Sequence, residues 1–149
     1  NVTGVSWMGG LVGYLSNTDG DVSIDNSYAT GSVIAPEPVN YGRYGGLIGS
    51  IYIYSTDPDD IKVNIRNSYS NGALSVTGPS AIGGLIGAYE HGAAHAIVAN
   101  SYWDTTTSGQ STSAGGTGKT TAELKQITTF DGLTQHRFVI SHSFCESEI

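Results

Sequence analysis

Two acidic loops hold the side chains of this chain that are best suited to chemistry, because clustered carboxylates can bind calcium or exchange protons. The carboxylates of the two loops are Asp19 and Asp21, and Asp57, Asp59 and Asp60. The first loop departs from an EF-hand, because Tyr28 stands where that loop needs a bidentate glutamate. Asp and Gly are also favoured in turns by local hydrogen bonding. We interpret both loops as turns, with weak calcium binding as the alternative.

Two further segments resemble parts of known sites. His91 and His95 lie one helical turn apart, as zinc ligands can, but the H-E-x-x-H pattern is absent and the segment is rich in Gly and Ala. Residues 115–120 contain Gly-Lys-Thr, whereas a phosphate-binding loop needs Gly in place of Ser113 and a hydrophobic strand before it. We therefore predict solvated histidines and a flexible linker. A short helix follows, capped by Thr120 or Thr121, with residues 122–126 as its body.

Acidic residues do not form a catalytic cluster in the repeated part of the sequence. Cleavage of a sugar chain needs two or three acids on one face, yet Asp25, Arg66 and Ala99 occupy one equivalent position of the repeats. We predict that the chain is not an enzyme, and that it has no catalytic residue, no cofactor and no metal site.

Aromatic side chains make a better case for binding, because exposed rings stack on sugars and anchor protein contacts. Seven of them lie outside the regular columns of the repeats: Trp7, Tyr41, Tyr44, Tyr52, Tyr54, Tyr89 and Trp103. Two interpretations stay open for these rings, which either form a binding surface or pack into corners of the core.

Two short sequence phrases recur in alternation along the chain. The structural unit that they form must position the side chains described above. The first is Gly-Gly-Leu-[Val/Ile]-Gly, at residues 9–13, 45–49 and 83–87. The second is Asn-Ser-Tyr, at residues 26–28, 67–69 and 100–102. Copies return every 33 to 41 residues, a period typical of repeat proteins in which each unit stacks on its neighbours.

The unit is predicted to be β. Ile24, Asn26 and Tyr28 alternate with a period of two, as in a strand, and the same pattern recurs around Asn67 and Asn100. A second strand is expected after a corner at Gly31, and the Gly-Gly-Leu phrase is expected to form a third. Stacked units would align Asn in an amide ladder and Tyr on Tyr. The predicted fold is all-β, a right-handed parallel β-helix (β-solenoid) of about three repeats; the alternative is an antiparallel sandwich.

Composition excludes several classes of partner. The net charge is −7 and only 13% of residues are charged, so binding to nucleic acid or to an anionic membrane surface is disfavoured. Cys145 is the single cysteine, which rules out a disulfide within the chain. Apolar runs are too short for a transmembrane helix, and we predict no membrane span.

The two phrases together resemble the GLUG repeat of bacterial surface and secreted proteins. Residues 26–49 look like one copy and residues 67–87 like another. Residues 101–125 are similar to the segment that closes such arrays. The resemblance implies repeats over 1–104 and a linker and closing segment with a short helix over 105–132. Residues 133–149 depart from the family and form an atypical, irregular tail, which we interpret as frameshifted rather than as a divergent cap.

The resemblance also implies a function. GLUG repeats occur in adhesin-like proteins, including filamentous-haemagglutinin-type exoproteins, so we expect a non-catalytic segment, extracellular or on a bacterial cell surface, that binds host or matrix glycans or proteins. The alternative is an accessory region of a large secreted enzyme such as an immunoglobulin-A-cleaving metallopeptidase. Val2-Thr3-Gly4 recurs as residues 76–78, so we expect the chain to begin inside a repeat, with an uncapped N-terminal edge open to end-to-end self-association.

Overall fold

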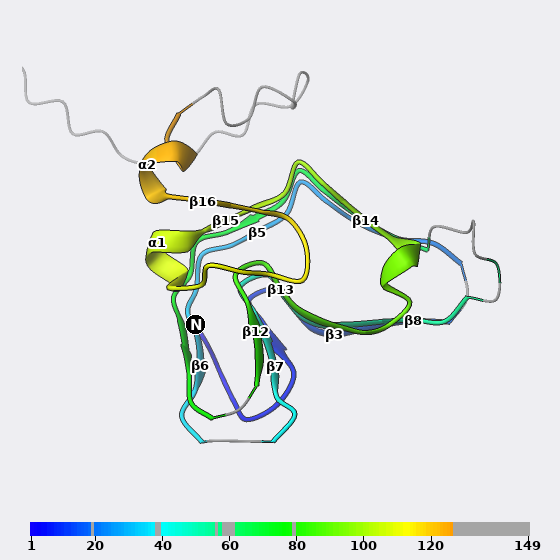
Figure 1. Cartoon of the computed structure of the whole chain (residues 1–149), viewed down its shortest axis with the longest axis horizontal. Coiled ribbons are helices and arrows are strands. Elements are labelled where there is room, and N and C mark those ends of the chain that lie inside the picture. Colours follow the sequence, from blue (N-terminus) through cyan, green and yellow to red (C-terminus); the bar gives the residue numbers. More distant parts are fainter. Residues whose placement is uncertain (19, 38–39, 56, 58–61, 79, 127–149) are drawn as a thin grey trace, which may run out of the picture.

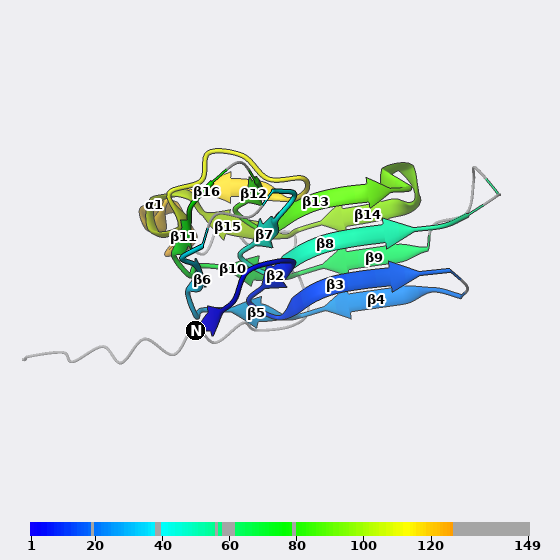
Figure 2. The same ribbon diagram turned by 90° about the horizontal axis from the view of Figure 1, so that it is seen from below.

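The protein is a stack of three similar layers of short strands. A computed structural model describes residues 1–18, 20–37, 40–55, 57, 62–78 and 80–126. In Figure 1 the layers lie over one another and trace the same bent outline, and Figure 2 shows them side by side. Every pairing between the described strands is parallel, which confirms an all-β fold and shows that the antiparallel sandwich is wrong.

Each layer contributes five strands. The first layer contains β1 (Val2–Thr3), β2 (Met8–Gly9), β3 (Val12–Asn17), β4 (Val22–Asp25) and β5 (Tyr28–Ala29). The second contains β6 (Val33–Ala35), β7 (Arg43–Gly45), β8 (Ile48–Ile53), β9 (Val63–Arg66) and β10 (Tyr69–Ser70). The third contains β11 (Leu74–Val76), β12 (Ala81–Gly83), β13 (Ile86–His91), β14 (Ala96–Ala99) and β15 (Tyr102–Asp104), with the short 3-10 helix η1 (Ala93–His95) before β14.

Equivalent strands of the layers form five small sheets. Their orders are β1-β6-β11, β2-β7-β12, β3-β8-β13, β4-β9-β14 and β5-β10-β15-β16. The register keeps equivalent residues of the repeats opposite one another, for example Ile24 against Ile65 and Ile65 against Val98. Residues far apart in the sequence therefore become neighbours one strand spacing apart, about 4.8 Å.

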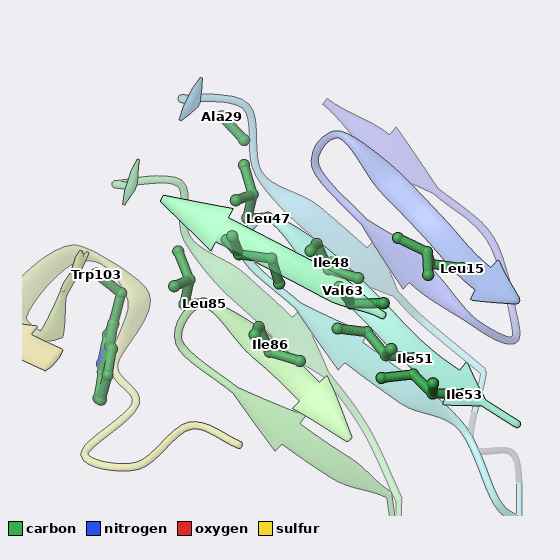
Figure 3. Packing of buried hydrophobic residues seen from close by; sticks show 11 residues of the cluster. Leu15, Ala29, Leu47, Ile48, Ile51, Ile53, Val63, Leu85, Ile86 and Trp103 are labelled. Atoms are coloured by element: carbon green, nitrogen blue, oxygen red, sulfur yellow. The ribbon is translucent and has the colours of Figure 1, made fainter. Parts of the chain in front are cut away.

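The apolar positions of the repeats form two cores. The larger lies between the sheets of β8 and β9, where Figure 3 shows Leu47, Ile48, Ile51 and Val63 pointing into the same interior. The smaller fills the limb between β6 and β7 and surrounds Tyr44, which is fully buried. The period-two pattern of these strands therefore reflects one face in a core and the other face outside.

The Asn-Ser-Tyr phrase forms a corner between two strands, so the prediction of one continuous strand is wrong. Asn26, Asn67 and Asn100 have φ angles of 51°, 52° and 48°. This left-handed conformation is one that Asn tolerates better than most residues. It ends β4 at Asp25, and β5 begins only at Tyr28.

Hydrogen bonds tie the stacked corners together. The amide N–H of Ser27 donates to Ser68 Oγ and that of Ser68 donates to Ser101 Oγ, each at 3.2 Å. The predicted amide ladder and ring stack are confirmed between the first two layers. Asn67 Nδ2 donates to Asn26 Oδ1 at 3.3 Å. The rings of Tyr28 and Tyr69 stack with centroids 5.5 Å apart.

The Gly-Gly-Leu phrase is a second corner, which corrects the prediction that it forms a third strand. β7 ends at Gly45 and β8 begins at Ile48, and the equivalent residues behave alike in the other layers. A Cβ added at Gly45 would overlap the carbonyl oxygen of Ile48, and one at Gly46 would overlap that of Gly84 in the next layer. The glycines are therefore required because backbone approaches backbone there.

The segment after the third layer packs against it. It contains α1 (Thr105–Ser108), β16 (Thr117–Lys119) and α2 (Thr121–Leu124). β16 pairs with β15, and Ala114 donates its amide N–H to the carbonyl oxygen of Ile86. The prediction of a flexible linker at residues 115–120 is therefore wrong. Residues 127–149, which include the atypical tail, lie outside the described residues.

Candidate binding surface

The acidic loops are only partly described. Asp21 and Asp57 are exposed, whereas Asp19, Asp59 and Asp60 lie outside the described residues. Across the part of the chain that the structure describes, no three His, Cys, Asp or Glu side chains gather as metal ligands. Weak calcium binding in these loops stays a hypothesis.

The other sequence candidates have structural partners. His91 ends β13, and its Nδ1 lies 2.9 Å from the carbonyl oxygen of Ile53, while His95 ends η1. Lys119 lies in β16, with its Nζ 3.9 Å from Glu123 Oε1. Thr120 caps α2 through a capping box with Glu123, which confirms one of the two predicted caps, although α2 ends at Leu124.

The seven singled-out aromatic residues divide between core and surface, so packing into the core holds for some of them and a binding surface stays a hypothesis for the exposed ones. Tyr44 and Trp103 are buried, and Trp103 Nε1 donates to the carbonyl oxygen of Gln110. Tyr52 and Tyr89 are half-buried, and burial raises the pKa of Tyr89 to about 12. The exposed rings are those of Trp7, Tyr41 and Tyr54.

One exposed surface lies in the angle where the sheet of β7 meets the sheet of β8. Figure 1 shows this bend of the backbone. The outward side chains of both sheets meet there, because their inward neighbours fill the two cores. We call this surface the elbow face and define it by Trp7, Tyr14, Arg43, Tyr52, Glu90 and His91. Ser50 lies behind it, fully buried and hydrogen-bonded to Glu90.

The register aligns the elbow face in columns across the layers. Tyr14, Ser50 and Ala88 form one column, and Ser16, Tyr52 and His91 form the next. Met8 pairs with Tyr44, so Trp7 and Arg43 lie at corresponding positions just before them. The columns therefore carry different residues in each layer, unlike the repeated interior.

Contacts across the angle hold the elbow face together. The rings of Trp7 and Tyr14 have centroids 5.3 Å apart and planes tilted by 36°. Arg43 Nε lies 2.6 Å from Glu90 Oε1, and Ser50 Oγ donates to the same oxygen at 3.3 Å. The Arg43 and Glu90 side chains keep 21% and 30% of their surface exposed, so this ion pair still meets solvent.

The last glycine of each Gly-Gly-Leu phrase sets the angle itself. A Cβ at Gly49 would lie 2.7 Å from the backbone of Met8, and one at Gly87 would lie 2.7 Å from the carbonyl oxygen of Tyr44. Any side chain there would force the sheets of β7 and β8 apart. The phrase therefore builds the elbow as well as the stack.

Sequence reasoning named Trp7 and Tyr52 but missed Tyr14, Arg43 and Ser50. Tyr14 lies one residue after the Gly-Gly-Leu-Val-Gly phrase, at a position held by Ser50 and Ala88 in the other layers. A tyrosine at a position that holds only small residues in the other two copies was the available signal. The sequence did not indicate that the chain bends at the Gly-Gly-Leu phrase, and only this bend brings Tyr14 to Trp7.

The repeat can be compared with known proteins. Residues 8–34, from β2 to β6, match the model of the GLUG motif. This chain carries the GLUG motif. The matched segment begins with one Gly-Gly-Leu corner and includes the following Asn-Ser-Tyr corner, so it holds both corners of the first layer, and the resemblance inferred from the sequence is confirmed.

Two named proteins are similar to the GLUG-bearing chain. A putative Gly-rich membrane protein of Evansella cellulosilytica is 37% identical over 109 residues, covering 73% of this chain and 11% of the relative. Halomucin of Haloquadratum walsbyi is 36% identical over 91 residues, covering 58% of this chain and 1% of the relative. The chain therefore spans a small part of each relative's length. No solved structure matches.

Helices are short throughout the described part of this GLUG-bearing chain. The longest have four residues, and none of the described helices has the length and apolar character needed to cross a membrane.

Proposed function

We propose that this chain is a non-catalytic repeat segment of a cell-surface or secreted protein, and that it serves as a rigid scaffold presenting a binding surface for glycans or proteins. The GLUG motif and the names of the two relatives, a membrane protein and a halomucin, support a place at the cell surface. An adhesin-like role follows if the elbow face is the part that meets a ligand.

The observation that carries the proposal is the contrast between interior and exterior columns. Inside, Leu47 and Leu85 follow one another, as do Ile48 and Ile86, and all four are fully buried. The opposite face of the same sheet carries Tyr14, then a serine, then an alanine. A constant interior with a variable exterior suits a scaffold on which surface positions are free to serve binding.

We further propose that the stack is a right-handed parallel β-helix. The in-register parallel strands and the two corners per layer support this fold. The handedness preferred by parallel crossover connections favours the right-handed form. An experimental structure with left-handed coils would contradict it.

The binding role is tested by screening the chain against arrays of glycans and extracellular-matrix proteins. The chain is detected through a tag added at one terminus. We expect at least one specific binder, and weaker binding by a double variant that replaces Trp7 and Tyr52 with Ala. Tyr28→Ala, on the β5 sheet, is the matched control. A screen with no binder, or a double variant that binds like the wild type, would contradict the proposal.

The edge strands of the first layer suit a second copy of this chain. Leu11 is 50% exposed there, whereas Leu47 and Leu85 at the same repeat position are fully buried. Strands β1 to β5 each pair on one side only among the described strands. We propose end-to-end self-association through this edge.

Self-association is tested by sedimentation over a range of protein concentrations. The wild type should shift towards dimer with concentration, and Leu11→Glu should stay monomeric. Ile97→Glu, which changes an exposed side chain of the third layer, is the control. A wild type that stays monomeric, or Leu11→Glu dimers of wild-type affinity, would overturn the proposed interface.

A further inference from the structure

The Trp7 and Tyr14 rings form an exposed aromatic pair that the stack does not require. Trp7 is 52% exposed and Tyr14 is 44% exposed. In the other layers the corresponding positions carry Arg43 and Ala81, and Ser50 and Ala88. Because Ala satisfies both columns in the third layer, large rings in the first layer are unnecessary for folding, and partly exposing them has a cost.

The backbone that carries the pair is anchored in both cores. Met8, next to Trp7, is buried in the smaller core, and Leu15, next to Tyr14, is buried in the larger one. A Cβ at Gly13 would lie 2.8 Å from the carbonyl oxygen of Trp7, so the two strands are closely packed at this corner. Binding would therefore require little ordering of the rings.

Polar groups lie directly beside the aromatic pair. Trp7 corresponds in register to Arg43, and Tyr14 pairs with Ser50. Arg43 and Ser50 both contact the Glu90 carboxylate. The site thus joins two ring faces, which attract polarised C–H groups, to a donor and an acceptor that can reach hydroxyl groups.

The charges of the site and of the whole chain favour neutral glycans over acidic ones. Arg43 is already paired with Glu90 at 2.6 Å, so the site offers no free cation to a sugar carboxylate or sulfate. The whole chain carries a net charge of −7, which repels polyanions. A neutral sugar, with an apolar C–H face and hydroxyl groups at its rim, matches both halves of the site.

We propose that Trp7, Tyr14, Arg43 and Glu90 form a subsite for one hexose of a neutral glycan, with the sugar face on the two rings and its hydroxyl groups on the ion pair. The proposal rests on the proposed role as a binding surface and specifies its ligand class. Two residues further along the same sheet face lies the Tyr52–His91 ring pair, with centroids 5.6 Å apart. A longer glycan would reach this pair.

The test uses the complete chain and three neutral probes, cellohexaose, chitohexaose and mannohexaose, with hexagalacturonate as the acidic counterpart. Tryptophan emission reports the site, because Trp7 is half exposed and Trp103 is 5% exposed. We expect a neutral probe to shift the emission, and calorimetry to give binding that Trp7→Ala and Tyr14→Ala each weaken by about tenfold or more. Trp7→Phe should retain part of it.

Tyr28→Ala is the control, since Tyr28 is 58% exposed in the same layer but belongs to the β5 sheet. Thermal unfolding of every variant shows that loss of binding is not loss of fold. No binding of any neutral probe, tighter binding of hexagalacturonate, or unchanged binding by Trp7→Ala would overturn the subsite. If the array screen still finds a binder that Trp7→Ala and Tyr14→Ala leave unaffected, the subsite fails while the general binding role stands.

Discussion

Asp104 accepts a hydrogen bond of 2.7 Å from the Thr121 hydroxyl, and this contact joins the two short helices that follow the third layer. The other carboxylate oxygen accepts from the amides of Thr106 and Thr107 at 2.8 and 3.1 Å. Asp104 is only 2% exposed. One buried carboxylate thus caps α1 and anchors α2, so it fixes the closing segment to the stack.

Asp104→Ala should destabilise the protein by about 2 kcal/mol, because it removes a helix cap and leaves the Thr106 and Thr107 amides without their acceptor. Urea unfolding measures the change, and hydrogen exchange should accelerate at the Thr106 and Thr107 amides. Thr117→Ala, at an exposed position of β16, should change little. Unchanged exchange at both amides would contradict this account of the cap.

Ser68→Ala should cost about 1–3 kcal/mol. Its hydroxyl accepts from the Ser27 amide and donates to the carbonyl oxygen of Arg66 at 2.8 Å, and Ser68 is 1% exposed. Ser27→Ala is a matched control in the first layer, where the hydroxyl donates to the carbonyl oxygen of Asp25 in an exposed setting. Equal losses in thermal unfolding for both variants would show that the stacked serines do not stabilise the layers.

Gly45→Ala should cost about 3 kcal/mol or more, because its methyl group would overlap the Ile48 carbonyl oxygen and lie 2.8 Å from the Gly87 amide nitrogen. Gly4→Ala should be far milder, since a Cβ there meets the flexible Met8 side chain at 2.9 Å. Chemical denaturation of the two variants tests the difference. If they are equally stable, close backbone approach is not the reason for glycine in the repeated phrase.

Alkaline pH should weaken the fold through Tyr89, whose pKa burial raises to about 12 from 10.0. A raised folded-state pKa means that the folded chain resists losing this proton, so its contribution is intact below pH 10 and is lost as pH rises towards 12. Tyr89→Phe should therefore lose less stability than the wild type between these values. Tyr41→Phe, which changes an 80% exposed ring, is the control. Parallel urea-unfolding profiles for wild type and Tyr89→Phe would contradict the assignment.

The sequence predicted the stack well because equivalent residues repeat at a nearly constant spacing. A parallel register is the arrangement that gives every copy the same neighbours, and the bonds between Asn26 and Asn67 and the stacked Tyr28 and Tyr69 rings follow from it. The capping box at Thr120 was also predictable, since Thr and Glu stand at the required spacing.

The corners were not predictable from alternation. Ile24, Asn26 and Tyr28 keep a period of two, whether or not the chain bends at Asn26, and only its φ of 51° reveals the bend. Likewise the Gly-Gly-Leu phrase suits a tight strand or a corner equally well. Periodicity records which residues recur, and it carries no information about where the backbone changes direction.

The sequence by itself determined that similar units repeat, and it favoured parallel stacking over an antiparallel sandwich, because repeated residues suit repeated surroundings. Only the tertiary structure decided which aromatic rings are exposed. Tyr44 directly precedes the second Gly-Gly-Leu phrase and lies in a core, whereas Tyr52 follows the same phrase and lies on the elbow face. The reason is that the angle between the sheets depends on the glycine contacts of Gly49 with Met8 and of Gly87 with Tyr44, between strands that meet only in the folded chain.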